Sequence, residues 1–472
     1  MNTLYLKSFI RCKRKAWLDF KGNKSFEIWS PHKAIDKIHQ YQIFSEFCNG
    51  DIYTGLKGCE KGSQGVIGFK IKENFFKNIT AEINPQLLVK TLGISKWGTY
   101  KYLPAVYKLG NKTTKEHLLD LAFTSILLEN FQESKVNKGL VISSFRGKIN
   151  VEEIYLNKKL RKKVLNILMS LNQSLEGFIP EITQDRKKCT ICSWQNFCDK
   201  EAKEKRYLTD IDGIGSKTAL LLKINGISDI KKLASYSEKE LGDKLFKFNN
   251  QKYEKASKFI KQAKAYFYGK SFYISSNNDS YDLLSKIDKG FYIFDIESNP
   301  DSKHDFLFGF LIKNNFLSKE KHPIYKPVLN LKNYKEEAYK EIINILSSNK
   351  EWPVLHYGET EKIAIINIGK KLNFSFEEVD LLQSRFVDLH ILIRSSWILP
   401  TKNYSLKTVS NWLGFEWEQK NVSGSKALYW WNQYQITGKE IFLKKIIKYN
   451  KYDCLATLNI AEWLIKNKSK KN

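Results

Sequence analysis

Three acidic side chains in the C-terminal part of the chain have the spacing of ligands for a divalent metal. Asp295 and Glu297 stand at the end of an apolar run, Gly290 to Ile296, that predicts a buried strand. Residues i and i+2 of a strand point to one face, so we expect both carboxylates to project together. Tyr449 and Asp453 lie four residues apart in a helical pattern and share a face. Neighbouring carboxylates repel each other unless a cation shares them, and hard ions such as Mg²⁺ or Mn²⁺ prefer oxygen ligands.

A fourth acid is expected after a second strand. Trp352 to Tyr357 has the pattern of this strand, and Gly358-Glu359-Thr360-Glu361 then opens a helix. This order of motifs resembles the DEDD exonucleases, the proofreading-type, RNase H-like superfamily, in its tyrosine subclass. The resemblance covers the C-terminal third of the chain, where it implies a mixed sheet flanked by helices.

The resemblance also implies roles for individual residues. Asp295, Glu297 and Asp453 match three of the four metal-binding acids, and Tyr449 matches the tyrosine that orients the attacking water. The fourth acid, usually Asp in the family, falls on Glu361, with Glu359 as the less favoured alternative; this exchange is expected to shift one metal and weaken activity.

The implied reaction is phosphodiester hydrolysis with two metal ions, which releases nucleotides from 3′ ends. Asp388, in Phe386-Val-Asp-Leu-His, lies where relatives carry an extra acid, and we interpret it as an alternative ligand or as a support behind the ligands. Ordinary solvated carboxylates are the alternative for any single acid.

A second candidate site is built from cysteines. Cys189, Cys192 and Cys198 form a C-x2-C-x5-C pattern, and Cys12 stands apart near the start. Three thiolates so close together suit zinc or an iron–sulfur cluster, each of which needs a fourth ligand. The pattern resembles RecB-like nucleases, in which a [4Fe–4S] cluster ties together the two ends of a PD-(D/E)XK domain. This implies Cys12 as the fourth ligand, while zinc remains the alternative.

The nuclease site that this second resemblance implies is degenerate here. Gln86 stands where the family carries Asp, and Val106 stands where an acid should precede a lysine by two positions. Asp120 occupies the place of a glutamine. Because Gln and Val cannot bind Mg²⁺ as carboxylates do, we expect this domain to have kept its fold and lost its chemistry. Glu82 is the acid that would restore a weak site in another register.

A glycine-containing turn in the middle of the chain resembles a helix-hairpin-helix motif. In Asp212-Gly213-Ile214-Gly215-Ser-Lys217, the glycines allow a tight turn, and the free N–H groups of the following helix could hold a phosphate, assisted by Lys217. Such motifs bind the nucleic-acid backbone without reading its sequence. A plain helical hairpin or a spacer is the alternative.

These motifs predict an α/β multidomain protein. We expect a RecB-like domain with the cluster in residues 1–203, a helical hairpin module in 205–266 and the RNase H-like exonuclease domain in 285–468. The polar stretch Ser275 to Ser280 is the predicted linker.

Composition supports a nucleic-acid partner. The 472 residues include 78 Lys and Arg against 50 Asp and Glu, a net charge of +28, although a general excess of Lys, Asn and Ile weakens this argument. No apolar run is long enough for a membrane span, and a reducing cytoplasm is expected, where cysteines favour metal binding over disulfides.

The motifs together resemble a bacterial group of RecB-family proteins. The chain has no Gly-x-x-x-x-Gly-Lys-Ser/Thr loop of a nucleotide-driven helicase. The leading prediction is a 3′→5′ exonuclease on DNA, in DNA processing or repair. An RNA exonuclease and a catalytically weak nucleic-acid-binding scaffold are the alternatives.

Overall fold

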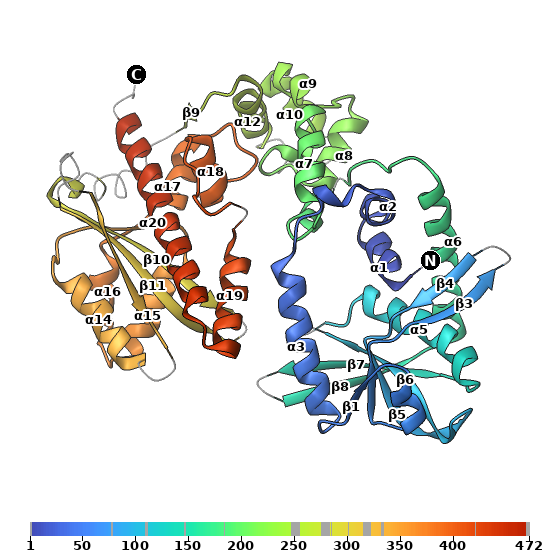
Figure 1. Cartoon of the computed structure of the whole chain (residues 1–472). Coiled ribbons are helices and arrows are strands. Elements are labelled where there is room, and N and C mark those ends of the chain that lie inside the picture. The colour runs from blue at the N-terminus through green and yellow to red at the C-terminus, as the bar shows by residue number, and fades with distance from the viewer. Residues whose placement is uncertain are drawn as a thin grey trace. The chain divides into compact units, whose positions relative to one another are not determined.

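The chain folds into two compact units, Met1–Glu201 and Ala202–Asn472. The computed structural model (Figure 1) describes residues 2–76, 79–108, 112–145, 148–183, 185–246, 255–274, 284, 286–300, 302–314, 322–331, 335–420 and 422–468. The linker predicted at Ser275 to Ser280 lies outside the described residues. No helix among those described is both long enough and apolar enough to cross a membrane.

The N-terminal unit has a mixed sheet with helices on both faces. Its six described strands follow the order β1-β2-β5-β6-β7-β8. Alternate strand residues point to opposite faces, so Val106 joins the core formed with α1, α2, α5 and α6, whereas Ala105 packs with Phe44 of α3. The elements are α1 (Thr3–Arg11), α2 (Lys13–Lys21), α3 (Pro31–Phe47), β1 (Ile52–Thr54), β2 (Gly65–Ile67), β5 (Leu87–Ser95), β6 (Gly98–Tyr107), α5 (Lys115–Gln132), β7 (Lys138–Phe145), β8 (Lys148–Tyr155) and α6 (Lys158–Glu176).

Short helices around a core of their own open the second unit, in agreement with the helical pattern of this stretch. They are η3 (Leu208–Asp210), α8 (Ser216–Ile224), α9 (Ile230–Ser235), α10 (Glu238–Phe246) and α12 (Ala256–Tyr268). The chain then forms β9 (Phe272–Tyr273), which pairs with β15 (Trp397–Ile398). An ion pair of 3.3 Å between Asp212 and Arg394 also joins these helices to the rest of the unit.

The remainder of the second unit is a five-stranded mixed sheet in the order β12-β11-β10-β13-β14. β10 runs antiparallel to β11 and parallel to β13, and β14 runs parallel to β13. The carboxyl ends of these three parallel strands therefore meet at one edge, where ligands usually bind in α/β sheets. The strands are β10 (Phe291–Asn299), β11 (His304–Lys313), β12 (Ile324–Leu329), β13 (Val354–His356) and β14 (Phe386–Asp388).

Helices cover both faces of this sheet, as Figure 1 shows. Phe291 and Ile293 of β10 belong to the core on the face of α17, α18 and α20, whereas Tyr292 and Phe294 belong to the core on the face of α14 and α15. Asp295 and Glu297 continue the first of these two series and therefore face α20. The helices are α14 (Lys335–Ser347), α15 (Thr360–Lys371), α16 (Phe376–Gln383), α17 (Leu389–Ser396), α18 (Leu406–Trp412), α19 (Gly424–Thr437) and α20 (Glu440–Lys468).

Candidate metal centre and associated sites

Three of the predicted acids meet between β10 and α20. Ligand oxygens of Asp295, Glu297 and Asp453 all lie within 4.8 Å of one another. The strand supplies two of them because i and i+2 share a face, and the helix that packs on this face supplies the third. Three oxygen donors at this separation could share a divalent ion.

The electrostatics of this group call for a cation. Burial, followed by the charge of Asp453, raises the pKa of both Asp295 and Glu297 well above the ordinary carboxyl range. Burial also raises the pKa of Asp453, to about 6, although hydrogen bonds oppose the rise. Glu297 and Asp453 are buried and Asp295 is half-buried. Because three carboxylates in such a place are costly to ionise without a positive partner, the arrangement fits a Mg²⁺ or Mn²⁺ site.

Aromatic donors hold the Asp453 carboxylate. Trp417 Nε1 donates a hydrogen bond of 2.7 Å to Asp453 Oδ1, and the hydroxyl of Tyr449 also hydrogen-bonds this side chain. Tyr449 is buried, and burial raises its pKa well above the usual tyrosine value, so it keeps its proton. The structure thus places the predicted tyrosine in contact with the predicted acid.

An amide holds the other side of the centre. Asn450 Nδ2 donates a hydrogen bond of 2.7 Å to Asp295 Oδ2. Its Oδ1 accepts a hydrogen bond of 2.8 Å from the hydroxyl of Tyr325. Asn450 is fully buried, so these bonds fix its orientation and, through it, that of the Asp295 carboxylate.

Glu361 lies near these acids but outside their group. It is buried in the first turn of α15, and its charge helps to raise the pKa of Asp295 and of Glu297. Its Oε2 lies 3.5 Å from Nδ1 of the buried His356. Glu359 is exposed, so the structure favours Glu361 between the two candidates for the fourth acid.

The carboxylate of Asp388 accepts hydrogen bonds from backbone N–H groups. One of its oxygens, Oδ1, accepts hydrogen bonds from the backbone N–H of Gly358 (3.2 Å), His390 (2.8 Å) and Ile391 (3.3 Å). Two of these donors belong to the first turn of α17, so Asp388 caps that helix. This geometry fits a support behind the candidate ligands better than an alternative ligand.

Residues 292–465 match the RNase_H superfamily. The match covers the five-stranded sheet, the acids and the tyrosine described above, so the C-terminal domain is RNase H-like. Such domains are generally nucleases, which hydrolyse nucleic acid with the help of divalent metals. No curated protein matches the chain at a significant level.

The four cysteines of the predicted cluster line a single cavity in the N-terminal unit. Arg14, Lys15 and Arg186 line the same cavity. Among the described residues, the cysteine sulfurs do not form a group within 4.8 Å of one another as the three acids do. Zn–S bonds of about 2.3 Å would place tetrahedral ligands roughly 3.8 Å apart, so the observed spacing is wider than one zinc ion requires. The cysteines are Cys12, Cys189, Cys192 and Cys198.

The degenerate nuclease positions of the N-terminal unit form an internal hydrogen-bonded network. Gln86 Nε2 donates to Asp120 Oδ2 over 3.3 Å, and its Oε1 accepts from the backbone N–H of Tyr107. The ammonium of Lys7 lies 2.5 Å from the same Asp120 oxygen. Glu82 of β4 (Ile79–Ile83) is paired instead with Lys72 of β3 (Ile71–Phe76) and with the preceding Lys70. Both acids of this region, Asp120 and Glu82, are therefore already paired with lysines.

The predicted hairpin turn is exposed. Gly213 adopts φ +84°, which favours glycine, and Gly215 directly precedes α8 without a capping side chain. A Cβ at Gly215 would have no neighbour within 4 Å, and Lys217 is exposed in the first turn of the helix. A three-residue 3-10 turn, Leu208–Asp210, stands immediately before the turn in place of a full helix.

Sequence reasoning missed three residues around the acids. Asn450 lies inside the motif that was recognised, next to Tyr449 and three residues before Asp453, so helical spacing could have drawn attention to it. Lys407 lies on α18, and its charge lowers the pKa of Glu297 and of Asp453 against the rise that burial causes. Trp417 lies on the segment after that helix. No local periodicity connects either residue to the acids.

Proposed function

We propose that the C-terminal domain is a 3′→5′ exonuclease that acts on DNA. The observation that carries this proposal is the contact between Tyr449 and Asp453 in a centre that also contains Asp295 and Glu297. A protonated tyrosine beside a metal-binding acid can hold a water molecule in line with a phosphodiester bond.

The chain's own groups have distinct tasks in this reaction. Asp295, Glu297 and Asp453 would hold the ions, with Glu361 as the remaining ligand. Divalent ions bound there would stabilise the charge on the attacking and the leaving oxygen. The water oxygen forms a bond to phosphorus and loses a proton to solvent. The bond to the 3′ oxygen of the preceding nucleotide breaks, that oxygen takes up a proton, and a nucleoside 5′-monophosphate leaves.

The test is degradation of 5′-labelled single-stranded DNA and RNA with Mg²⁺ or Mn²⁺, by wild type and by Asp295→Asn. A ladder that shortens from the 3′ end and is lost in the variant supports the exonuclease, and the faster substrate identifies the preferred sugar. Binding without cleavage by the wild type would support the scaffold alternative instead.

We also propose that the N-terminal unit no longer cleaves nucleic acid. Gln86 and Val106 replace the two acids that a metal would need, and the nearby Asp120 is already bound by the ammonium of Lys7 and the amide of Gln86, which supports this proposal. The Asp295→Asn variant with added Mn²⁺ tests it, because robust residual cleavage by that variant would show a second active centre.

The cavity of the four cysteines is proposed to hold a [4Fe–4S] cluster. Its cationic lining suits a group that carries negative charge together with four thiolates, and the buried Nε and Nη1 of Arg186 have no hydrogen-bond partner within the protein. Iron and acid-labile sulfide in protein purified without oxygen, both lost in Cys192→Ser, are the expected result. Stoichiometric zinc without iron would contradict it.

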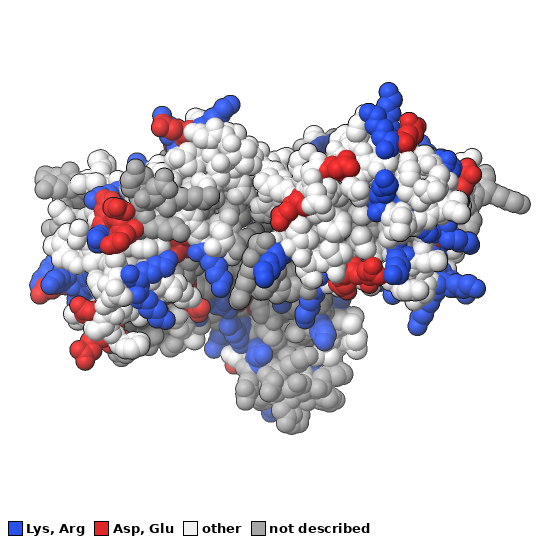
Figure 2. All heavy atoms as spheres, turned by 90° about the horizontal axis from the view of Figure 1, so that it is seen from below, with Lys and Arg blue, Asp and Glu red and all other residues white. Residues whose placement is uncertain are grey.

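The exposed turn at Gly213 and Gly215 is proposed to bind the substrate backbone, with Lys217 adding a positive charge. Net charge by itself does not identify such a surface. On the face seen in Figure 2, Lys and Arg side chains are spread out, with Asp and Glu side chains among them.

A further inference from the structure

Lys407 places an amine beside the metal-binding acids although it is not itself a metal ligand. It lies in the first turn of α18, and its Nζ donates a hydrogen bond to the carbonyl oxygen of Val422. The same Nζ lies 5.1 Å from the ring centroid of Tyr449 and 5.4 Å from that of Trp417. Both rings flank Asp453, because each hydrogen-bonds its carboxylate. Lys407 is therefore held at the edge of the candidate metal centre.

The charge of Lys407 acts on the acids without occupying them. It lowers the pKa of Glu297 and of Asp453, against the rise that burial causes. Among the described residues, no carboxylate oxygen lies within the 4.0 Å of an ion pair from its Nζ. The acid oxygens thus remain available to metal ions. An ammonium group has three donors, and the bond to Val422 uses one of them, so two remain for a ligand.

The ligand that fits these donors is an oxygen of a phosphate group. A lysine ammonium is a compact point charge that binds phosphate oxygens. Phosphoryl transfer spreads negative charge over the phosphoryl oxygens in the transition state, and a cation in a poorly solvated site stabilises that charge more strongly than one in water.

We propose that Lys407 is a further catalytic residue of this site, whose ammonium group contacts a non-bridging oxygen of the scissile phosphate on the Tyr449 side. This inference rests on the proposed nuclease function and adds to it a protein-borne cation. Burial lowers the pKa of Lys407, but the charges of Asp453 and Glu297 oppose this fall, and Lys407 keeps its proton throughout. The water oxygen bonds to phosphorus and loses a proton to solvent, the 3′ oxygen departs and takes up a proton from solvent, and the ammonium offsets the charge that accumulates on the phosphoryl group.

A purely structural role for Lys407, which would be to hold the segment of Val422 in place, has a different signature. Removing a positive charge from beside Glu297 and Asp453 removes repulsion toward divalent ions. A catalytic Lys407 therefore predicts metal affinity that is unchanged or tighter in its absence, with slower turnover. A structural Lys407 predicts a distorted centre with weaker metal affinity.

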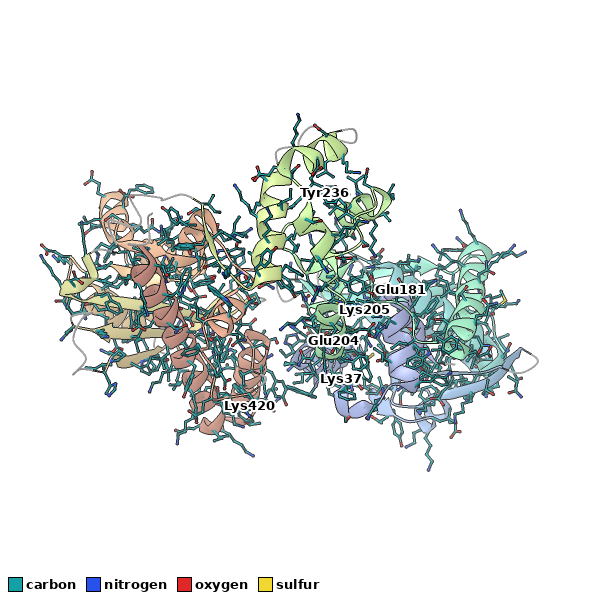
Figure 3. The ribbon with its side chains drawn as sticks, turned by 90° about the horizontal axis from the view of Figure 1, so that it is seen from above. Lys37, Glu181, Glu204, Lys205, Tyr236 and Lys420 are labelled. Carbon is teal, nitrogen blue, oxygen red and sulfur yellow. The ribbon has the colours of Figure 1, made fainter. Side chains whose placement is uncertain are left out.

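The test compares cleavage by wild type, Lys407→Met and Lys407→Arg over a range of Mn²⁺ concentrations. We expect kcat of Lys407→Met to fall about 100- to 1000-fold, as when one donor to a developing anion is removed, with KM changed only a few-fold. The loss persists at saturating Mn²⁺, and Lys407→Arg recovers part of the rate. Lys420→Met is the matched control, since Lys420 is exposed on the segment between α18 and α19 (Figure 3).

The other possible results contradict either the catalytic role of Lys407 or the proposed exonuclease function. Wild-type turnover in Lys407→Met, or a loss that saturating Mn²⁺ repairs, overturns the catalytic role and leaves the exonuclease proposal standing. A wild type that cleaves neither DNA nor RNA overturns the proposed function and this inference with it. Lys407→Gln replaces Lys407→Met in the same comparison if the methionine variant loses its thermal unfolding transition.

Discussion

Asn450 and Asp295 are joined by a hydrogen bond of 2.7 Å between a fully buried amide and the first acid of the metal centre. The amide of Asn450 has no freedom to turn, because Tyr325 donates to its oxygen from the other side. Outer partners of this kind orient metal ligands, and their loss typically costs about 10- to 100-fold in metal affinity or activity.

Asn450→Ala is therefore expected to weaken the apparent affinity for Mn²⁺ in the cleavage assay about 10- to 100-fold. The measurement is the Mn²⁺ concentration that gives half-maximal rate. Tyr325→Phe serves as the comparison, since it removes only the donor to Asn450, and its effect should be smaller. Equal Mn²⁺ dependence in wild type and Asn450→Ala would show that Asp295 needs no such support.

Gly309 faces Asp295 across the β10–β11 pair and leaves room for Asn450. A Cβ at Gly309 would lie 1.7 Å from Asn450 Oδ1, so Gly309→Ala must displace the amide. We expect a loss of activity of at least about tenfold and a destabilisation of about 1–3 kcal/mol from the overfilled site.

Two variants make this prediction specific. Gly424→Ala at the start of α19 is the control, because its Cβ would meet nothing within 4 Å, and we expect it to be close to neutral. The double variant Gly309→Ala/Asn450→Ala should lose less than the sum of the single losses, since both changes act on one contact. Strict additivity would contradict the proposed link.

A contact in the metal centre could be predicted from the sequence only where its two residues lie close together along the chain. Asp295 and Glu297 follow from strand alternation, and Tyr449 with Asp453 follows from helical spacing, because both are local rules. The contact of Trp417 with Asp453 depends on how the segment after α18 lies against α20, which no local pattern encodes.

Contacts within the fold differ in the same way between local and distant partners. The mixed sheet and its flanking helices were expected from the resemblance to the DEDD exonucleases, which rests on short local motifs. The pairing of Asp295 with Gly309 arises from strand register, and the approach of Asn450 to both arises from the docking of α20. Register and docking are set by the whole core, so the supporting residues became visible only in the folded chain.

The raised pKa values of the acids predict how metal-free protein responds to pH. Asp453 has a pKa of about 6 in the folded state, chiefly because it is buried, against about 4 for an ordinary aspartate. The folded state then binds more protons than the unfolded state, so stability falls as pH rises from about 4 through about 6. We expect the melting temperature of the C-terminal unit in EDTA to drop by several degrees over this range.

Divalent metal should reverse this trend, because the ionised acids are its ligands. Thermal unfolding with and without Mn²⁺ is the measurement. The stabilisation by Mn²⁺ should grow from about pH 5, below the pKa of Asp453, to about pH 8, above it. Asp453→Asn is the control and should flatten both dependences. A wild-type melting temperature in EDTA that rises over this range would contradict the assignment of buried, mutually repelling acids.

The hairpin turn predicts a salt-dependent contribution to binding. Lys217→Glu should weaken the affinity of the cleavage-deficient Asp295→Asn protein for single-stranded DNA and reduce the slope of log affinity against log salt by about 1, as expected for one lost phosphate contact. Fluorescence anisotropy at several salt concentrations measures both. Lys239→Glu, an exposed position on α10, makes the same charge change and should leave the slope closer to that of the parent. Matching slopes in both variants would indicate a general charge effect instead of a contact at the turn.

Glu361 predicts how many ions the centre needs. It is buried beside His356 and lies outside the group of three close acids, so its role would be to bind a second ion. Glu361→Gln should lower the rate about 100-fold and change the Mn²⁺ dependence from cooperative to hyperbolic, because one of two ions loses a charged ligand. Glu361→Asp should keep the cooperative dependence, and the exposed Glu359→Gln should behave as wild type. A cooperative dependence that survives in Glu361→Gln would mean that Asp295, Glu297 and Asp453 bind both ions without it.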